Sequence, residues 1–67
     1  MSVQLIAANL RRMRLAKGLS QEELAESAGL SRLAYRNLEK AASTPRTATL
    51  MALARALGVG VDRLLRP

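Results

Sequence analysis

Residues 21–40, QEELAESAGLSRLAYRNLEK, have the pattern of two short helices joined by a tight turn. Ser20 stands just before the first helix and Glu23 follows it three residues later. This spacing is typical of a capping box, which pairs two backbone donors at a helix start. Gly29 is expected to end the first helix, because glycine takes the left-handed conformation of helix ends without strain. Ser31 then suits the N-cap position of the second helix.

The second of these helices separates its residues by chemistry. At about 100° per residue, one arc is suited to packing and contains Ala34, Tyr35, Leu38 and Ala41. The opposite arc carries three cations, one amide and one leucine but no acid: Arg32, Leu33, Arg36, Asn37 and Lys40. Amide and cationic groups can hydrogen-bond base edges or phosphates, and a leucine can contact a thymine methyl group. The alternative is a basic surface helix with one exposed leucine, which is common and usually without function.

The same residues carry a resemblance to a known family. SQEELAESAGLSRLAYRNLEK is similar to the helix-turn-helix of the lambda-repressor/Cro-like (XRE-type) DNA-binding domains. The similarity continues through ALGVGVDRLL and covers residues 5 to 65. The positions that match the family's spacing are Ser20-Gln21, Leu24-Ala25, Gly29, Ser31 and Leu38-Glu39. The resemblance implies an all-α fold, namely a compact five-helix bundle of the lambda repressor-like DNA-binding type with a central helix-turn-helix.

Length and composition agree with a small helical domain. The chain has 67 residues, which we interpret as one helix-turn-helix domain over residues 1–67, with the alternative that it is the N-terminal part of a longer protein. Nearly half of the residues are apolar, mostly leucine and alanine, which are strong helix formers. The net charge of +6 favours polyanionic partners, meaning nucleic acid or an anionic membrane surface.

Several classes of function lack their usual residues in this chain. There is no cysteine or histidine, so the commonest metal ligands and the usual general base are missing. We therefore expect no enzymatic activity, no metal site and no cofactor. No apolar run reaches membrane-spanning length and no signal-peptide pattern is present. We expect a cytoplasmic protein with no membrane partner.

The segment before the central motif predicts a helix over residues 2–17, with an apolar stripe of Val3, Ile6, Ala7, Leu10 and Met13. Arg14 falls inside that stripe, and a buried cation needs a partner. Glu39, at the edge of the packing face of the third helix, is the candidate. In the resembled family an arginine and a glutamate at corresponding positions form such a pair. We predict an Arg14–Glu39 salt bridge; the alternative is that Arg14 extends to solvent.

After residue 40 the sequence predicts a loop, a helix over Thr47–Leu57, a stop at Gly58 and a short helix over Val61–Leu65. The residue expected to cap the fourth helix is Thr47 or, less simply, Thr44. The apolar residues of the C-terminal region exceed what a small core needs, and in repressors of the resembled kind this region often helps to form a dimer. We therefore expect a dimer interface containing Leu57, Val59, Val61, Leu64 and Leu65, although these residues would also close the core.

Two positions depart from the resembled family. Tyr35 stands where a branched aliphatic residue is usual, and a tyrosine fits there only if its hydroxyl reaches water or a partner. Ala41 stands where a glycine is frequent, so the exit from the third helix is expected to differ.

The resemblance implies how the domain binds DNA. In the resembled domains the second helix crosses the phosphate backbone and the third enters the major groove. Carried to matching positions, the residues that face base edges are Arg32, Leu33, Arg36 and Asn37. Those that contact the DNA backbone are Gln21, Ser31, Lys40, Ser43, Thr44 and Arg46. The expected function is that of a repressor-like transcriptional regulator that binds double-stranded DNA at a near-palindromic operator as a homodimer.

The main alternative is an antitoxin or protein-interaction module in which DNA binding is secondary. Its partner would be another protein or a C-terminal domain outside this chain. Membrane-surface binding fits the charge but not five capped helices with a shared core. Single-stranded or RNA binding usually needs aromatic platforms, and Tyr35 is the only aromatic residue.

Overall fold

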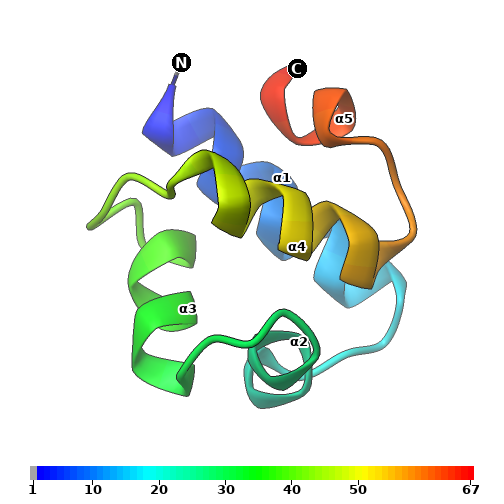
Figure 1. Ribbon diagram of the computed structural model, residues 1–67. Coiled ribbons are helices and arrows are strands. Elements are labelled where there is room, and N and C mark those ends of the chain that lie inside the picture. Colours follow the sequence, from blue (N-terminus) through cyan, green and yellow to red (C-terminus); the bar gives the residue numbers. More distant parts are fainter. Residues whose placement is uncertain (1) are drawn as a thin grey trace.

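A computed structural model describes residues 2–67, which form five helices and no strand. The helices are α1 (Val3–Ala16), α2 (Gln21–Ser27), α3 (Arg32–Glu39), α4 (Thr47–Leu57) and α5 (Val61–Leu65). The expected all-α class and five-helix order are confirmed. In Figure 1, α1 and α4 cross the middle of the bundle, α2 and α3 lie below them, and α5 packs near the upper end. Within residues 2–67 no helix combines the length and apolar character needed to span a membrane.

The helix starts follow the capping residues of the sequence. The Glu23 amide donates to the Ser20 hydroxyl oxygen at 3.0 Å, and the Ser20 amide donates to the Glu23 carboxylate at 2.8 Å. The predicted capping box is therefore confirmed. The Ser31 hydroxyl oxygen accepts from the Ala34 amide at 3.1 Å, as expected of the N-cap of α3. These local bonds fix where α2 and α3 begin.

The start of α4 differs from the expectation. Arg46 occupies the N-cap position and makes no side-chain cap hydrogen bond, so the proposed capping roles of Thr47 and Thr44 are wrong. Thr47 is already the first helical residue, one position too late to cap.

The core is formed by side chains from all five helices. Its largest fully buried side chains are Tyr35, Ile6, Leu10, Leu24, Leu53 and Leu64. All five helices supply side chains to the core, so each helix is needed to complete it. Of the packing faces predicted for the first and third helices, the structure buries Ile6, Ala7, Leu10, Met13, Tyr35 and Leu38, whereas Val3, Ala34 and Ala41 are half-buried.

Asn9 is a buried residue whose role the sequence did not indicate. Its Nδ2 atom donates to the carbonyl oxygens of Leu64 at 3.0 Å and Arg66 at 2.9 Å. Its Oδ1 atom accepts from Arg12 Nη2 at 2.9 Å. Carbonyl groups at a helix end lack partners within the helix, and Asn9 supplies them for α5. The amide therefore fastens the C-terminal segment to α1.

The exit from α3 places an alanine in the left-handed region. Ala41 has a φ of 58°, whereas the corresponding position after α2 is Gly29 with a φ of 73°. The Ala42 amide donates to the Asn37 carbonyl at 2.8 Å, which is the six-residue bond of a Schellman motif. The chain thus forms the usual Schellman helix end with an alanine in the left-handed position, where a glycine would be unstrained.

We expect Ala41→Gly to stabilise the protein. Removing the strain of an alanine in the left-handed conformation stabilises the folded state by about 1–2 kcal/mol. The greater conformational freedom of glycine in the unfolded chain offsets about 0.5–1 kcal/mol of this gain. The net gain in the free energy of unfolding should be about 0.5–1 kcal/mol, measurable by urea denaturation. Ala42→Gly is the matched control, because Ala42 has no positive φ, and it should destabilise. Equal effects of the two substitutions would contradict the explanation.

Candidate nucleic-acid interface

The turn between α2 and α3 sets the two helices at a fixed angle. Gly29 takes a left-handed conformation and the Leu30 amide donates to the Ala25 carbonyl at 2.8 Å. Leu30 packs against the core, which holds the turn down between the helices. The pair occupies the lower part of Figure 1, with the N-terminal half of α3 furthest from α5. The outer side of α3 is therefore free along its length.

A buried ion pair joins the C-terminal end of α3 to α1. Arg14 Nε lies 2.6 Å from Glu39 Oε2, and Arg14 Nη2 donates to Glu39 Oε1 at 3.1 Å. Arg14 Nη1 also donates to the Leu19 carbonyl at 2.9 Å, so the guanidinium is held on both sides. The predicted Arg14–Glu39 pair is present, and it ties α1 to the end of α3. A two-pronged contact of this kind fixes geometry as well as charge.

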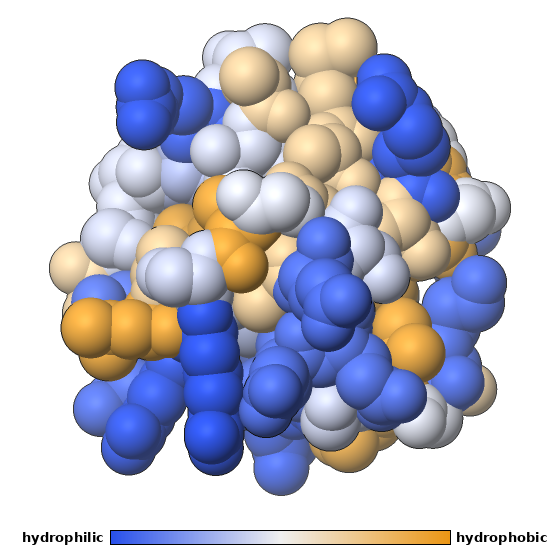
Figure 2. Space-filling model, turned by 60° about the horizontal axis from the view of Figure 1, so that its bottom comes forward, coloured by the Kyte–Doolittle hydropathy of each residue, from blue (hydrophilic) through white to orange (hydrophobic). Residues whose placement is uncertain are grey.

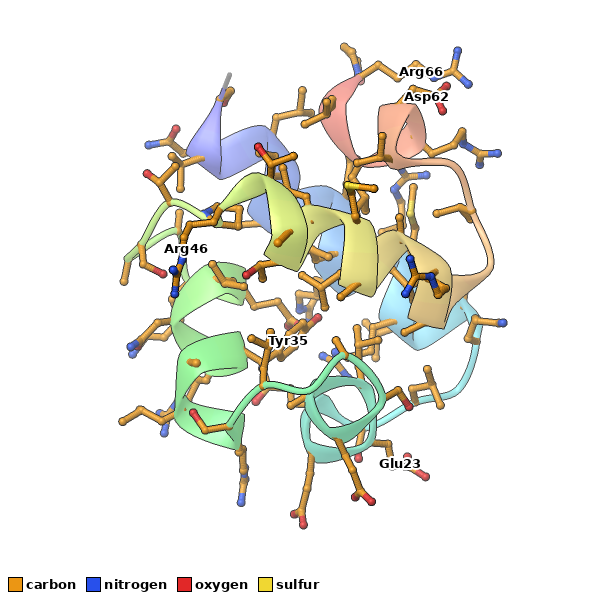
Figure 3. The ribbon with its side chains drawn as sticks, viewed as in Figure 1. Glu23, Tyr35, Arg46, Asp62 and Arg66 are labelled. Carbon is orange, nitrogen blue, oxygen red and sulfur yellow. The ribbon has the colours of Figure 1, made fainter. Side chains whose placement is uncertain are left out.

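Tyr35 completes this cluster, since its hydroxyl donates to Glu39 Oε2. This bond supplies the partner that a buried tyrosine needs, and the fold therefore accommodates the departure at this position. Burial raises the pKa of Tyr35, and the hydrogen bond to Glu39 adds to that rise, so the hydroxyl stays protonated and can donate. Figure 3 shows Tyr35 pointing from α3 into the interior of the bundle.

The cluster also determines the charge of Glu39. Burial alone would raise the pKa of this carboxyl group. Hydrogen bonds from Arg14, Tyr35 and Gln21 outweigh burial, and the pKa of Glu39 lies below its ordinary value of 4.5. In turn, the hydrogen bond to Glu39 raises the pKa of Arg14 despite its burial. Both groups are therefore ionised at neutral pH.

The lowered pKa of Glu39 predicts loss of stability in acid. Between the folded and unfolded pKa values the unfolded chain binds more protons, so acid favours unfolding. The contribution of Glu39 is complete above about pH 4.5 and disappears as the pH falls through its folded pKa. We expect Glu39→Gln to flatten the fall in the free energy of unfolding between neutral and acid pH. Glu26→Gln is the control, because it makes the same exchange on an exposed side chain of α2 and should leave the pH profile unchanged. An unchanged pH profile for Glu39→Gln would contradict this account.

The outward face of α3 has the composition that the sequence indicated. Leu33 is 66% exposed, and Arg32, Arg36 and Lys40 are exposed beside it. Asn37 is half-buried at the edge that faces α4. Figure 2 brings the side of α2 and α3 forward, and strongly hydrophilic side chains predominate in the lower half of that view, with a few hydrophobic ones among them. The residues predicted to face base edges therefore share one accessible surface.

A hollow lies beside α3, where the loop meets the start of α4. It has a volume of about 290 Å³, and its polar lining includes Asn37, Ser43, Thr44 and Arg46. Figure 3 shows Arg46 extending beside the C-terminal end of α3. A concave surface with hydroxyl, amide and guanidinium donors can hold an anionic oxygen. The structure thus brings together Asn37 and three of the residues predicted to contact the DNA backbone.

Gln21 and Ser31 stand at the starts of α2 and α3. Gln21 is half-buried and its Nε2 atom donates to Glu39 Oε1 at 3.2 Å. Ser31 is exposed, and its oxygen already accepts the cap bond of α3. Both side chains still have a hydrogen to donate, since a primary amide has two and a hydroxyl has one. These two positions therefore remain able to bind an anion.

The surface expected for dimerisation is partly corrected. Leu57 and Leu64 are buried in the core of the single chain, so the structure removes them from the residues that a partner could contact. Val61 and Leu65 are 37% and 42% exposed, and Val59 is half-buried. Sequence reasoning missed the exposed Met51 of α4, which lines a shallow hollow of about 340 Å³ with Ala54, Arg55, Val59 and Val61. Its place on the solvent side of α4 was the available signal.

The family model HTH_3, described as helix-turn-helix, matches residues 10–64. The chain belongs to this helix-turn-helix family. Its match to the XRE-type DNA-binding domains, which the sequence resembles, is thereby confirmed.

Three members illustrate the likeness to this family. The HTH-type transcriptional regulator y4dJ of Sinorhizobium fredii is 39% identical over 64 residues, which are 96% of this chain and 83% of the relative. The crystal structure of a hypothetical transcription factor, NHTF from Neisseria, superposes with a TM-score of 0.93 at 37% identity, covering 97% of this chain and 75% of that one. The restriction-modification controller protein C.AhdI of Aeromonas hydrophila has a TM-score of 0.90 at 34% identity, covering 92% of this chain and 94% of the other.

Proposed function

We propose that the protein is a transcriptional regulator that binds a specific DNA sequence as a homodimer, with α3 in the major groove. The observation that carries this proposal is the outward face of α3. It presents Arg32, Leu33, Arg36 and Lys40 to solvent without an acid among them. On the packing side of this helix, Glu39 is bound by Arg14, Gln21 and Tyr35, and these contacts hold the helix rigidly. A major groove admits one helix, and guanidinium and amide groups there distinguish base pairs.

The residues around α3 are suited to hold the DNA backbone. In this arrangement Asn37 reaches a base edge from the rim of the hollow beside α3. Ser43, Thr44 and Arg46, on the far side of that hollow, would bind phosphates of the same strand, while Lys40 binds a phosphate from the end of α3. Phosphate contacts of this kind set the position and orientation of a domain, and base contacts supply the specificity.

The exposed apolar surface of α4 and α5 is the proposed contact between two copies. It consists of Met51, Val59, Val61 and Leu65, with Arg55 at its margin. A two-fold axis through this surface would direct both copies of α3 to the same side of the dimer. Half-sites would then lie about one helical turn of DNA apart, roughly 34–36 Å, which requires a near-palindromic operator.

Selection from a random-duplex library, with sequencing and at two salt concentrations, tests the proposal. Enrichment of a near-palindromic site that persists at the higher salt is the expected result. Binding that enriches no sequence and vanishes with salt would overturn it, because release of counterions from phosphates gives such affinity without specificity. The role of an antitoxin or protein-interaction module would then take its place, with the apolar surface of α4 and α5 as the contact.

A further inference from the structure

The Glu39 carboxylate is the meeting point of three helices. Its Oε1 atom accepts from Arg14 Nη2 at 3.1 Å and from Gln21 Nε2 at 3.2 Å. Its Oε2 atom accepts from Arg14 Nε at 2.6 Å and from the Tyr35 hydroxyl. A carboxylate has about four acceptor positions, and here all of them are filled. The side chain is only 4% exposed, so the carboxylate has neither a spare position nor room to turn.

This arrangement fixes the orientation of the Gln21 amide. If the amide were turned by 180°, its oxygen would face the negative Glu39 Oε1 atom and the two would repel. The Nε2 atom is therefore held against Glu39, and only one of its two hydrogens is used there. The second hydrogen is left for another acceptor, at the first residue of α2 and on a half-buried side chain.

We propose that Tyr35 is a positioning residue for DNA binding: its hydroxyl holds the Glu39 carboxylate so that Gln21 presents a fixed N–H donor to a backbone phosphate. This inference rests on the proposed function. Arg14 alone grips one edge of the carboxylate, whereas Tyr35 reaches Oε2 from within α3, four residues before Glu39. Without the hydroxyl, Oε2 would lose a donor and the carboxylate could tilt toward Arg14, away from Gln21. The aromatic ring fills the core in either case, and the hydroxyl is the part that acts on Gln21.

The test is a double-mutant cycle with Tyr35→Phe and Gln21→Ala. Affinity for the selected operator is measured at a temperature where circular dichroism shows every variant to be folded. Each single substitution should weaken binding by about twofold to tenfold, the effect of one hydrogen bond. The double variant should bind no more weakly than Gln21→Ala, because the hydroxyl acts through that residue. Arg46→Ala is the matched control; it removes a proposed phosphate contact outside the cluster, so its loss should add to that of Tyr35→Phe.

A second measurement on the free protein does not depend on DNA. The separation between the two side-chain amide proton NMR shifts of Gln21 should differ from that of the exposed Gln4 in the wild type, since one proton is bound to Glu39, and it should move toward the Gln4 value in Tyr35→Phe. Unchanged shifts, unchanged operator affinity, or additive losses in the cycle would each overturn the inference. Failure of the wild-type protein to bind any operator would instead overturn the proposed function, and the NMR result would distinguish the two.

Discussion

Glu39→Ala is expected to leave the protein largely unfolded at 37 °C. The substitution deprives the buried guanidinium of Arg14 of its counter-charge and the Tyr35 hydroxyl of its acceptor. Removing one member of a buried ion pair costs about 3–5 kcal/mol. A single core in a chain of this length supplies little more than about 3–5 kcal/mol in total. Urea denaturation followed by circular dichroism at 10 °C and thermal melting would measure the loss.

Glu26→Ala is the matched control for this experiment. It changes the net charge by the same amount, but Glu26 is exposed on α2, so the free energy of unfolding should stay within about 0.5 kcal/mol. A loss below about 1 kcal/mol for Glu39→Ala, or equal losses for the two variants, would show that the cluster is not a main source of stability. The comparison separates the buried ion pair from the general effect of removing an acid.

The parts of the fold that the sequence predicted depend on neighbours close along the chain. The capping bonds of Ser20 with Glu23 and of Ser31 with Ala34 each join residues three positions apart. The starts of α2 and α3 could therefore be predicted from the sequence alone. The Arg14–Glu39 pair spans 25 residues, yet it was predictable because a cation inside an apolar stripe demands a partner. A residue that breaks a local pattern therefore carries information about distant contacts.

The features that were missed depend on packing that no local pattern encodes. Asn9 bonds to carbonyl groups 55 and 57 residues away, and an asparagine on the flank of an apolar stripe looks like any surface amide. The apolar residues of α4 and α5 raised a similar difficulty. Leu64, Val61 and Leu65 are all apolar in the sequence, but only the packing of α5 against α1 and α4 decides that Leu64 is buried while the other two are exposed.

For the candidate interface, the sequence predicted which side chains are exposed better than it predicted the contacts that support them. The exposed face of α3 was readable because helical spacing alone separates Arg32, Leu33 and Arg36 from the packing side. The hydrogen bonds that Gln21 and Tyr35 make to Glu39 were not readable, since they depend on the angle between α2 and α3. Helical spacing along the chain therefore predicts which groups a surface presents, but not the contacts between helices that hold the surface rigid.

The second large effect is expected from Arg32→Ala combined with Asn37→Ala. Both side chains are proposed to hydrogen-bond base edges in the major groove. Loss of a good bidentate base contact costs about 1–3 kcal/mol, so each should weaken operator binding by about tenfold to a hundredfold. Binding to a scrambled duplex should fall much less, because Lys40 and Arg46 remain to hold phosphates. Fluorescence anisotropy with both duplexes at two salt concentrations measures the ratio of specific to non-specific affinity.

Arg11→Ala combined with Gln4→Ala is the matched control, since it also removes one cation and one amide. Both residues are exposed on α1 and neither is assigned a DNA contact, so the ratio of specific to non-specific affinity should not change. Equal losses in the two double variants would mean that overall charge, not the face of α3, determines binding. A ratio that stays constant while Arg32→Ala/Asn37→Ala still dimerises would contradict base readout by these residues and favour a role in protein interaction. Only a fall in that ratio confined to the α3 variant agrees with insertion of this helix into the major groove.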